Sequence, residues 1–315
     1  MTPRTRRRSA TRPLLAAAAL GLLAASAAPA QTPSRWSVET PTGPSKTIAF
    51  EATEGTWMSL SVAPDGKTLV FDLLGHLYEL PIAGGTATRL TSGRSWNLFP
   101  RYSPDGRTIA FSSDREGSYD VWLLDRTSGA LQRVSRATVA QSENIYRPNW
   151  STDGTTLYAM SERDGAPNRL LAFDRQGNAK TVLEEGALLG SAIAEPDGRS
   201  LLLERRDAPL YHFAFNPYVT PSSGVRIDRL DTRMGEIVTR AARPGGAFAP
   251  AVSPNGSELA FLHRAIDETV LIVRDLVTGR ERTLVRGLDR DRQQGTGAYG
   301  PAPAIAWHPD GRRLF

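Results

Sequence analysis

The sequence predicts an all-β protein assembled from repeated four-stranded units behind an export signal. Three observations lead to this expectation. A short turn motif recurs six times, each copy precedes alternating apolar and polar residues, and most units contain a second turn signal. The copies lie 40 to 58 residues apart, and their glycines are Gly66, Gly106, Gly154, Gly198, Gly256 and Gly311.

The turn motif reads Ser-Pro-Asp-Gly or a close variant of it. Proline fixes φ at the first corner, Asp or Asn can bond back to the nearby backbone, and glycine accepts the left-handed conformation that closes a tight hairpin. The residues after each turn alternate, as in Thr108–Phe111, and this pattern predicts a half-buried strand.

A second hairpin is predicted later in each unit. In the second unit it comprises Asp120–Asp125, a turn at Ser128 and Gly129, and Leu131–Val134. Each unit therefore supplies four short strands, which is typical of the blades of a β-propeller. Helical repeats are excluded because the apolar spacing is two and a Pro-Asp-Gly turn interrupts the units.

These units define the predicted domain organisation. Residues 31–47 form a short lead, and residues 48–315 form a β-propeller of at least six repeats, the last of them truncated. The sixth repeat reaches Phe315 with one strand only, which would leave a bare sheet edge. We therefore expect the propeller to be incomplete at its C-terminus and to be a fragment of a longer protein.

Residues 1–30 have the features of a signal peptide. They contain five arginines and no acidic residue, followed by an apolar run over Leu14–Ala28 and a small-x-small cleavage site at Ala28–Ala30. An uncleaved anchor is the alternative, and the export route, Sec or Tat, stays open. Without this segment the chain has 33 basic and 33 acidic residues, so its net charge of +5 does not indicate nucleic acid. We expect a periplasmic or secreted protein with no membrane span after cleavage.

Motifs that would indicate chemistry within the chain are missing. There is no cysteine and no Gly-x-Ser-x-Gly elbow, and the four histidines form no metal-binding pattern. Residues 295–300 match Gly-x-Gly-x-x-Gly, but they lack the strand and the helix that a dinucleotide site requires. The sequence therefore predicts no catalytic, cofactor-binding or metal-ligating residue in this chain.

Loops of the predicted blades hold the candidate contacts for a partner or ligand. Two are arginines that follow second strands, and four lie in an aromatic insertion at 205–224: Arg115, Arg163, Tyr211, His212, Phe213 and Tyr218. Two structural interpretations stand beside this one. The arginines would form ion pairs between neighbouring blades, and the insertion would be an apolar plug against a blade.

The repeat Ser-Pro-Asp-Gly-x-x-Ile-Ala-Phe-x-Ser-Asp-Arg resembles the WD40-like (PD40) blade of TolB-type propellers over residues 48–315. The segment Ile48–Trp57 further resembles the start of secreted bacterial amidohydrolases, which carry such a propeller before a metal-dependent hydrolase domain. That resemblance implies a divalent metal in a C-terminal domain beyond Phe315, and a non-catalytic propeller that acts in substrate access or partner docking. The alternatives are a periplasmic interaction module of TolB type and the propeller of a prolyl-oligopeptidase-like serine peptidase.

Overall fold

The computed structural model describes residues 38–40, 43–55, 58–186, 188–206, 225–265, 268–288 and 304–315. The predicted signal peptide at 1–30 lies outside the described residues, as do Tyr211, His212, Phe213 and Tyr218 of the aromatic insertion.

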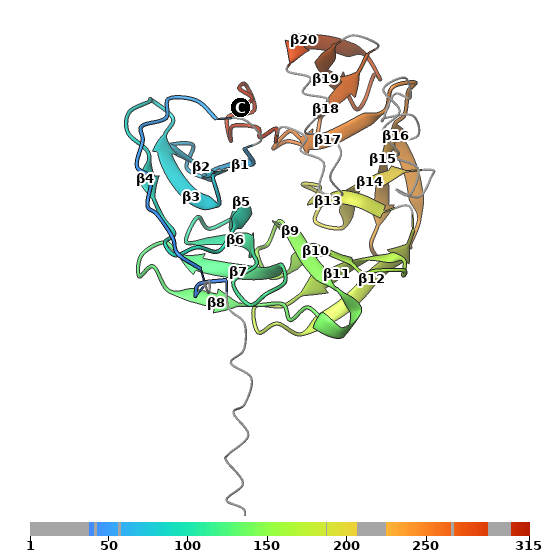
Figure 1. Ribbon diagram of the computed structural model, residues 1–315. Coiled ribbons are helices and arrows are strands. Elements are labelled where there is room, and N and C mark those ends of the chain that lie inside the picture. Colours follow the sequence, from blue (N-terminus) through green and yellow to red (C-terminus); the bar gives the residue numbers. More distant parts are fainter. Residues whose placement is uncertain are drawn as a thin grey trace, which may run out of the picture. The chain divides into compact units, whose positions relative to one another are not determined.

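The described residues form five four-stranded antiparallel sheets, which confirms the all-β propeller (Figure 1). The strands of each sheet follow chain order, and the first strand of each is innermost (Figure 1). Blade 1 contains β1 (Leu60–Val62), β2 (Thr68–Leu73), β3 (His76–Pro81) and β4 (Thr88–Arg89); blade 2 contains β5 (Asn97–Tyr102), β6 (Thr108–Ser113), β7 (Asp120–Asp125) and β8 (Leu131–Arg133). Blade 3 contains β9 (Asn144–Trp150), β10 (Leu157–Glu162), β11 (Asn168–Phe173) and β12 (Ala179–Glu185); blade 4 contains β13 (Leu188–Ala194), β14 (Ser200–Arg206), β15 (Val225–Asp231) and β16 (Ile237–Ala241). Blade 5 contains β17 (Ala247–Val252), β18 (Glu258–Arg264), β19 (Thr269–Asp275) and β20 (Glu281–Leu288), and a short 3₁₀ helix lies at Val139–Gln141.

The repeated turn adopts the conformation that its sequence predicts. All six motif glycines have φ between 68° and 72°, a region that favours glycine. In blade 2, the Ser103 hydroxyl donates to Asp105 Oδ1 at 2.6 Å and accepts the Thr108 amide at 3.0 Å. Ser151 in blade 3 and Ser253 in blade 5 make the same pair of bonds. The motif is therefore a closed hydrogen-bonded hairpin.

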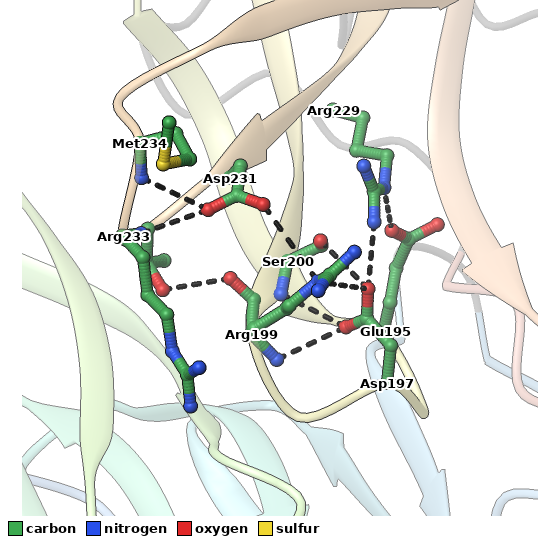
Figure 2. A network of polar contacts seen from close by, with 9 residues as sticks. Glu195, Asp197, Arg199, Ser200, Arg229, Asp231, Arg233 and Met234 are labelled. Atoms are coloured by element: carbon green, nitrogen blue, oxygen red, sulfur yellow. Dashed lines mark hydrogen bonds and ion pairs between the residues drawn. The ribbon is translucent and has the colours of Figure 1, made fainter.

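Blade 4 builds the same turn with charged groups (Figure 2). Glu195 occupies the serine position and is buried, with 5% of its surface exposed. Arg229 on β15 donates from Nε to Glu195 at 2.6 Å and from Nη2 to Asp197 at 2.6 Å. Backbone amides, the Ser200 hydroxyl and Arg229 lower the pKa of Asp197 to about 2, against the effect of burial. A carboxylate in the serine position thus has a neighbouring arginine as its counterion.

Apolar layers lie between successive blades. Val70 and Leu77 of blade 1 pack with Ile109, Phe111 and Trp122 of blade 2. Equivalent clusters join blades 2 and 3, 3 and 4, and 4 and 5. Because a single blade buries only part of its apolar surface, each sheet depends on its neighbour for stability.

The sixth repeat differs from the prediction. The described residues contain five complete blades rather than six, and the sixth repeat contributes a hairpin with one bridge pair, Trp307 and Leu314. The indole Nε1 of Trp307 donates to Ala251 O in blade 5 at 3.0 Å. Trp150 Nε1 makes the same contact between blades 3 and 2, where it donates to Arg101 O at 3.3 Å. The sixth repeat therefore already makes the tryptophan contact by which an inner strand joins the blade before it. Residues 304–315 contain no further strands of a sixth blade.

That hairpin also contacts blade 1. His308 Nε2 lies 3.0 Å from the carbonyl oxygen of Gly66, the motif glycine of the first turn. Side-chain bulk at Gly66 would collide with this imidazole, since an added Cβ would lie 2.6 Å from Nε2. The two most distant copies of the motif therefore meet. No helix among the described residues is both long and apolar enough to cross a bilayer.

Candidate functional site

Arg115, the first predicted contact residue, is held inside blade 2. Its Nη2 donates to Asn97 Oδ1 at 2.8 Å, its Nε donates to Ser113 Oγ at 3.1 Å, and its guanidinium lies 4.7 Å from the Trp122 ring centroid. Burial lowers its pKa. These contacts stabilise its own blade, so the expected link between neighbouring blades is wrong for this residue.

Arg163, the second predicted contact residue, behaves in the same way in blade 3. Its Nη2 donates to Pro167 O and to Glu184 Oε1, both at 2.9 Å. Glu184 belongs to β12 of the same sheet. The structure therefore does not bring Arg115 and Arg163 together at one site, and their use by a partner stays a prediction.

A different region, at the inner strands, has the features of a binding site. Four of the five inner strands change register at one level, including Leu98–Arg101 in β5 and Phe248–Ala251 in β17. Phe99, Arg147 and Ala249 have φ of 57°, 56° and 51°, and each precedes a proline. Non-glycine residues adopt this region at a cost of about 1–3 kcal/mol, so the surrounding structure must hold them in place.

The preceding blade supplies that support. Asp72 Oδ2 of blade 1 accepts the Phe99 amide at 2.7 Å, and Ser112 Oγ of blade 2 accepts the Arg147 amide at 3.0 Å. Glu204 of blade 4 accepts the Ala249 amide through its carboxylate. Each strained residue is thus fixed by a polar side chain from the second strand of the blade before it.

These strands line a cavity of about 390 Å³. Every described blade contributes to its wall, as does the C-terminal hairpin: Ser59, Leu60, Ser61, Asp72, Leu98, Phe99, Arg101, Arg147, Asn149, Ile193, Glu204, Ala249, Pro250, Ala251, Val252, Pro254, Ala304, Ile305, Ala306 and Trp307. The cavity wall is therefore partly apolar and carries four ionisable groups, Asp72, Arg101, Arg147 and Glu204. Such a composition can bind a ligand and fix its orientation.

Two arginines dominate the charge of one side of this wall. Burial, opposed by Asp72 and assisted by the nearby Arg147, lowers the pKa of Arg101 to about 10. The Arg147 guanidinium lies 4.9 Å from the Phe99 ring centroid, a cation–π contact.

The two carboxylates of the wall are anchored to the backbone. Asp72 is 4% exposed, and burial raises its pKa to about 6 although it accepts the amides of both Ser59 and Phe99. Glu204 lies over Gly190, where an added Cβ would be 1.9 Å from its Oε2. Position 190 therefore requires glycine, which also supplies the φ of 64° found there.

The wall presents both hydrogen-bond donors and acceptors. Among the described residues, no three His, Asp or Glu side chains are grouped so as to hold a metal ion. The cavity offers guanidinium donors, carboxylate acceptors and an aromatic ring at fixed positions, which suits the binding of a polar segment.

Sequence reasoning did not select this cavity, although one signal was present. Phe99, Arg147 and Ala249 each lie seven residues before a motif glycine and directly before a proline. Aligning the repeats on Gly106, Gly154 and Gly256 would have marked this as a shared kink.

Comparisons with known proteins agree with this architecture. The model of the tricorn protease N-terminal beta propeller domain matches residues 59–214. A Tol-Pal system protein TolB from Francisella tularensis subsp. mediasiatica is 23% identical over 233 residues, which cover 70% of this chain and 48% of that protein. An uncharacterized protein of Agrobacterium fabrum is 36% identical over 77 residues, 23% of this chain and 26% of that protein.

A solved structure of a TolB candidate from Agrobacterium tumefaciens superposes with a TM-score of 0.62 at 21% identity, over 82% of this chain and 89% of that one. The chain contains a TolB-like β-propeller. It spans about half the length, or less, of the curated relatives that it matches. The TolB-like propeller is thus shown as a fold, and its inner-strand cavity is the candidate site on it.

Proposed function

We propose that this chain is the non-catalytic binding portion of an exported protein, and that its inner-strand cavity receives a segment of a partner protein. One observation carries the proposal: every described blade contributes to a single cavity whose wall is fixed by bonds between blades. Preorganised walls of this kind reduce the ordering cost of binding. The export signal predicted at 1–30 supports a periplasmic or secreted location.

The size and chemistry of the cavity favour a polypeptide segment as the occupant. A volume of about 390 Å³ accommodates a few side chains rather than a folded domain. Kinked inner strands next to buried polar groups offer both main-chain and side-chain bonding. Relatives named Tol-Pal system proteins add support for docking of a protein partner.

The absence of native cysteine allows a direct test. Ser61→Cys places one thiol in the cavity wall, and Val277→Cys places one on an outer turn where Val277 is 87% exposed. The full chain is used to select binders from a random peptide library, and each variant is then labelled with a bulky maleimide.

We expect the label at position 61 to weaken the selected peptides by about tenfold or more, because it fills the cavity. The label at position 277 should leave their affinity unchanged. If the label at position 61 has no effect, or if no peptide is enriched, the proposal fails.

A second candidate is the N-terminal propeller of a metal-dependent amidohydrolase, and the segment Ile48–Trp57 favours it. Ile48 and Phe50 of this segment are 74% and 66% exposed. The same fold also occurs in a puromycin hydrolase, where the match has a TM-score of 0.51 at 17% identity and covers 41% of that longer chain. The coding sequence of the parent gene tests this candidate. A His-x-His motif downstream of the propeller would support it, and a Gly-x-Ser-x-Gly motif would support a serine peptidase. The absence of both motifs would support a TolB-type module.

A further inference from the structure

Arg101 on β5 is partly buried, and its partners differ from those of most other partly buried arginines among the described residues. Its Nε donates to Asn149 Oδ1 at 3.0 Å, and its Nη1 donates to Leu60 O at 3.0 Å and to Pro100 O at 2.8 Å. All three acceptors are neutral oxygens. Its Nη2 takes part in none of these bonds.

Other partly buried arginines contact carboxylates directly. Arg229 pairs with Glu195 at 2.6 Å, Arg133 with Asp120 at 2.6 Å, and Arg205 with Asp228 at 2.7 Å. Within the described part of the chain, no carboxylate forms such an ion pair with Arg101. A partly buried guanidinium that bonds only to neutral groups keeps its charge where solvation is reduced, and an anion beside it would compensate that charge.

The surroundings of Arg101 increase this demand for an anion. Arg147 lines the same cavity and is close enough to lower the pKa of Arg101. Asp72, whose charge acts on Arg101, has both carboxylate oxygens engaged by the amides of Ser59 and Phe99. The positive side of the cavity is therefore built from rigid elements on β5 and β9.

We infer that Arg101, with Arg147 beside it, forms a carboxylate-binding subsite within the cavity. The inference rests on the proposed function and specifies it: the docked segment carries an acidic side chain or a free C-terminus that reaches Arg101. A guanidinium supplies the opposite charge that strengthens a hydrogen bond to a carboxylate, and Nη2 remains to donate that bond.

Trifluoroacetate is a suitable probe because its fluorine NMR line broadens when it binds a protein of this size. Trifluoroacetamide is its neutral counterpart. The full chain is titrated with each, and the experiment is repeated with Arg101→Met and with Arg280→Gln, which removes an exposed arginine from the β19–β20 turn.

We expect trifluoroacetate to bind the unmodified chain and Arg280→Gln equally, with its affinity reduced about tenfold or more in Arg101→Met. Trifluoroacetamide should not bind. If Arg101→Met binds trifluoroacetate as well as the unmodified chain does, the subsite is overturned, and equal binding of trifluoroacetamide also overturns it. Should Arg101→Met not fold, competition in the unmodified chain decides: acetate must displace trifluoroacetate and acetamide must not.

The trifluoroacetate titration tests the carboxylate subsite, and the peptide selection tests docking in the cavity, so either claim can be overturned without the other. Peptides that bind in the cavity while trifluoroacetate does not would leave docking intact and remove the carboxylate subsite. Peptides with an amidated C-terminus, and peptides with Glu→Gln or Asp→Asn changes, distinguish a chain terminus from an acidic side chain as the source.

Discussion

One end of each inner strand is similar from blade to blade, and the other end is not. At the end that enters the turn, Ser103, Ser151 and Ser253 make the same two hydrogen bonds, and all motif glycines have nearly the same φ. Toward the cavity, equivalent positions hold different residues, such as Arg101 in blade 2 and Asn149 in blade 3. The repeated end closes the sheet, and the varied end determines what the cavity can bind.

Blade 4 shows how far the repeated end can vary. Glu195 replaces the serine there, and Arg229 provides its counterion. The turn keeps its shape because the added charge is neutralised next to it. In contrast, no carboxylate among the described residues forms an ion pair with Arg101, which lines the cavity.

The largest expected effect is at the blade 4 turn. Arg229→Met leaves the buried Glu195 carboxylate without its partner, so we expect the free energy of unfolding to fall by about 3 kcal/mol. Urea denaturation measures it. Glu195→Ser combined with Arg229→Met restores the common turn and should recover most of the loss. Equal destabilisation in the single and the double variant would contradict the account.

A smaller effect is expected from Asp72, which fixes the strained residue Phe99. Burial raises the pKa of Asp72 to about 6 from 3.8, so folding favours its protonated form. The contribution of Asp72 to the free energy of unfolding is therefore present at low pH and is lost as pH rises through about 6. Between about pH 5 and about pH 7.5, the loss should be about 1.5 kcal/mol.

Urea midpoints of the unmodified chain and of Asp72→Asn isolate this contribution. The difference in stability between the two chains should change with pH in the direction given, since the side-chain amide of the variant does not titrate. A difference that is constant across this pH range would show that Asp72 keeps an ordinary pKa in the folded chain.

The smallest effect is expected at a neutral turn. Ser103→Ala removes the bonds to Asp105 and Thr108 and should cost about 1 kcal/mol. Blade 1 already has Ala63 at this position, so Ala63→Ser offers the reverse comparison and should be stabilising. Thermal unfolding measures both. A gain from Ser103→Ala would mean that the hydroxyl does not support the hairpin.

The sequence predicted the turn end of the inner strands better than the cavity end. Residues such as Gly106 and Ser103 act through local geometry, which repeats in every unit, so the turn and the strands after it could be predicted. Phe99 and Arg147 acquire their conformation from Asp72 and Ser112 in the preceding blade. Such contacts between blades have no local pattern, and the cavity was therefore missed.

The blade number shows a related limit. The turn motif at His308 and Gly311 predicted a sixth unit, and its hairpin does form. A turn motif specifies a hairpin, however, and a complete blade needs the strands that follow. The six motifs therefore correspond to five four-stranded sheets and one hairpin among the described residues.

The central claim is that the cavity docks a polypeptide segment whose carboxylate meets Arg101. A double-mutant cycle tests it most directly, using a selected acidic peptide, its amide counterpart, the unmodified chain and Arg101→Met, with affinities measured by titration calorimetry. We predict that either change alone weakens binding by about tenfold or more, and that the second change then adds little. Additive losses would place the peptide carboxylate away from Arg101 and contradict the account.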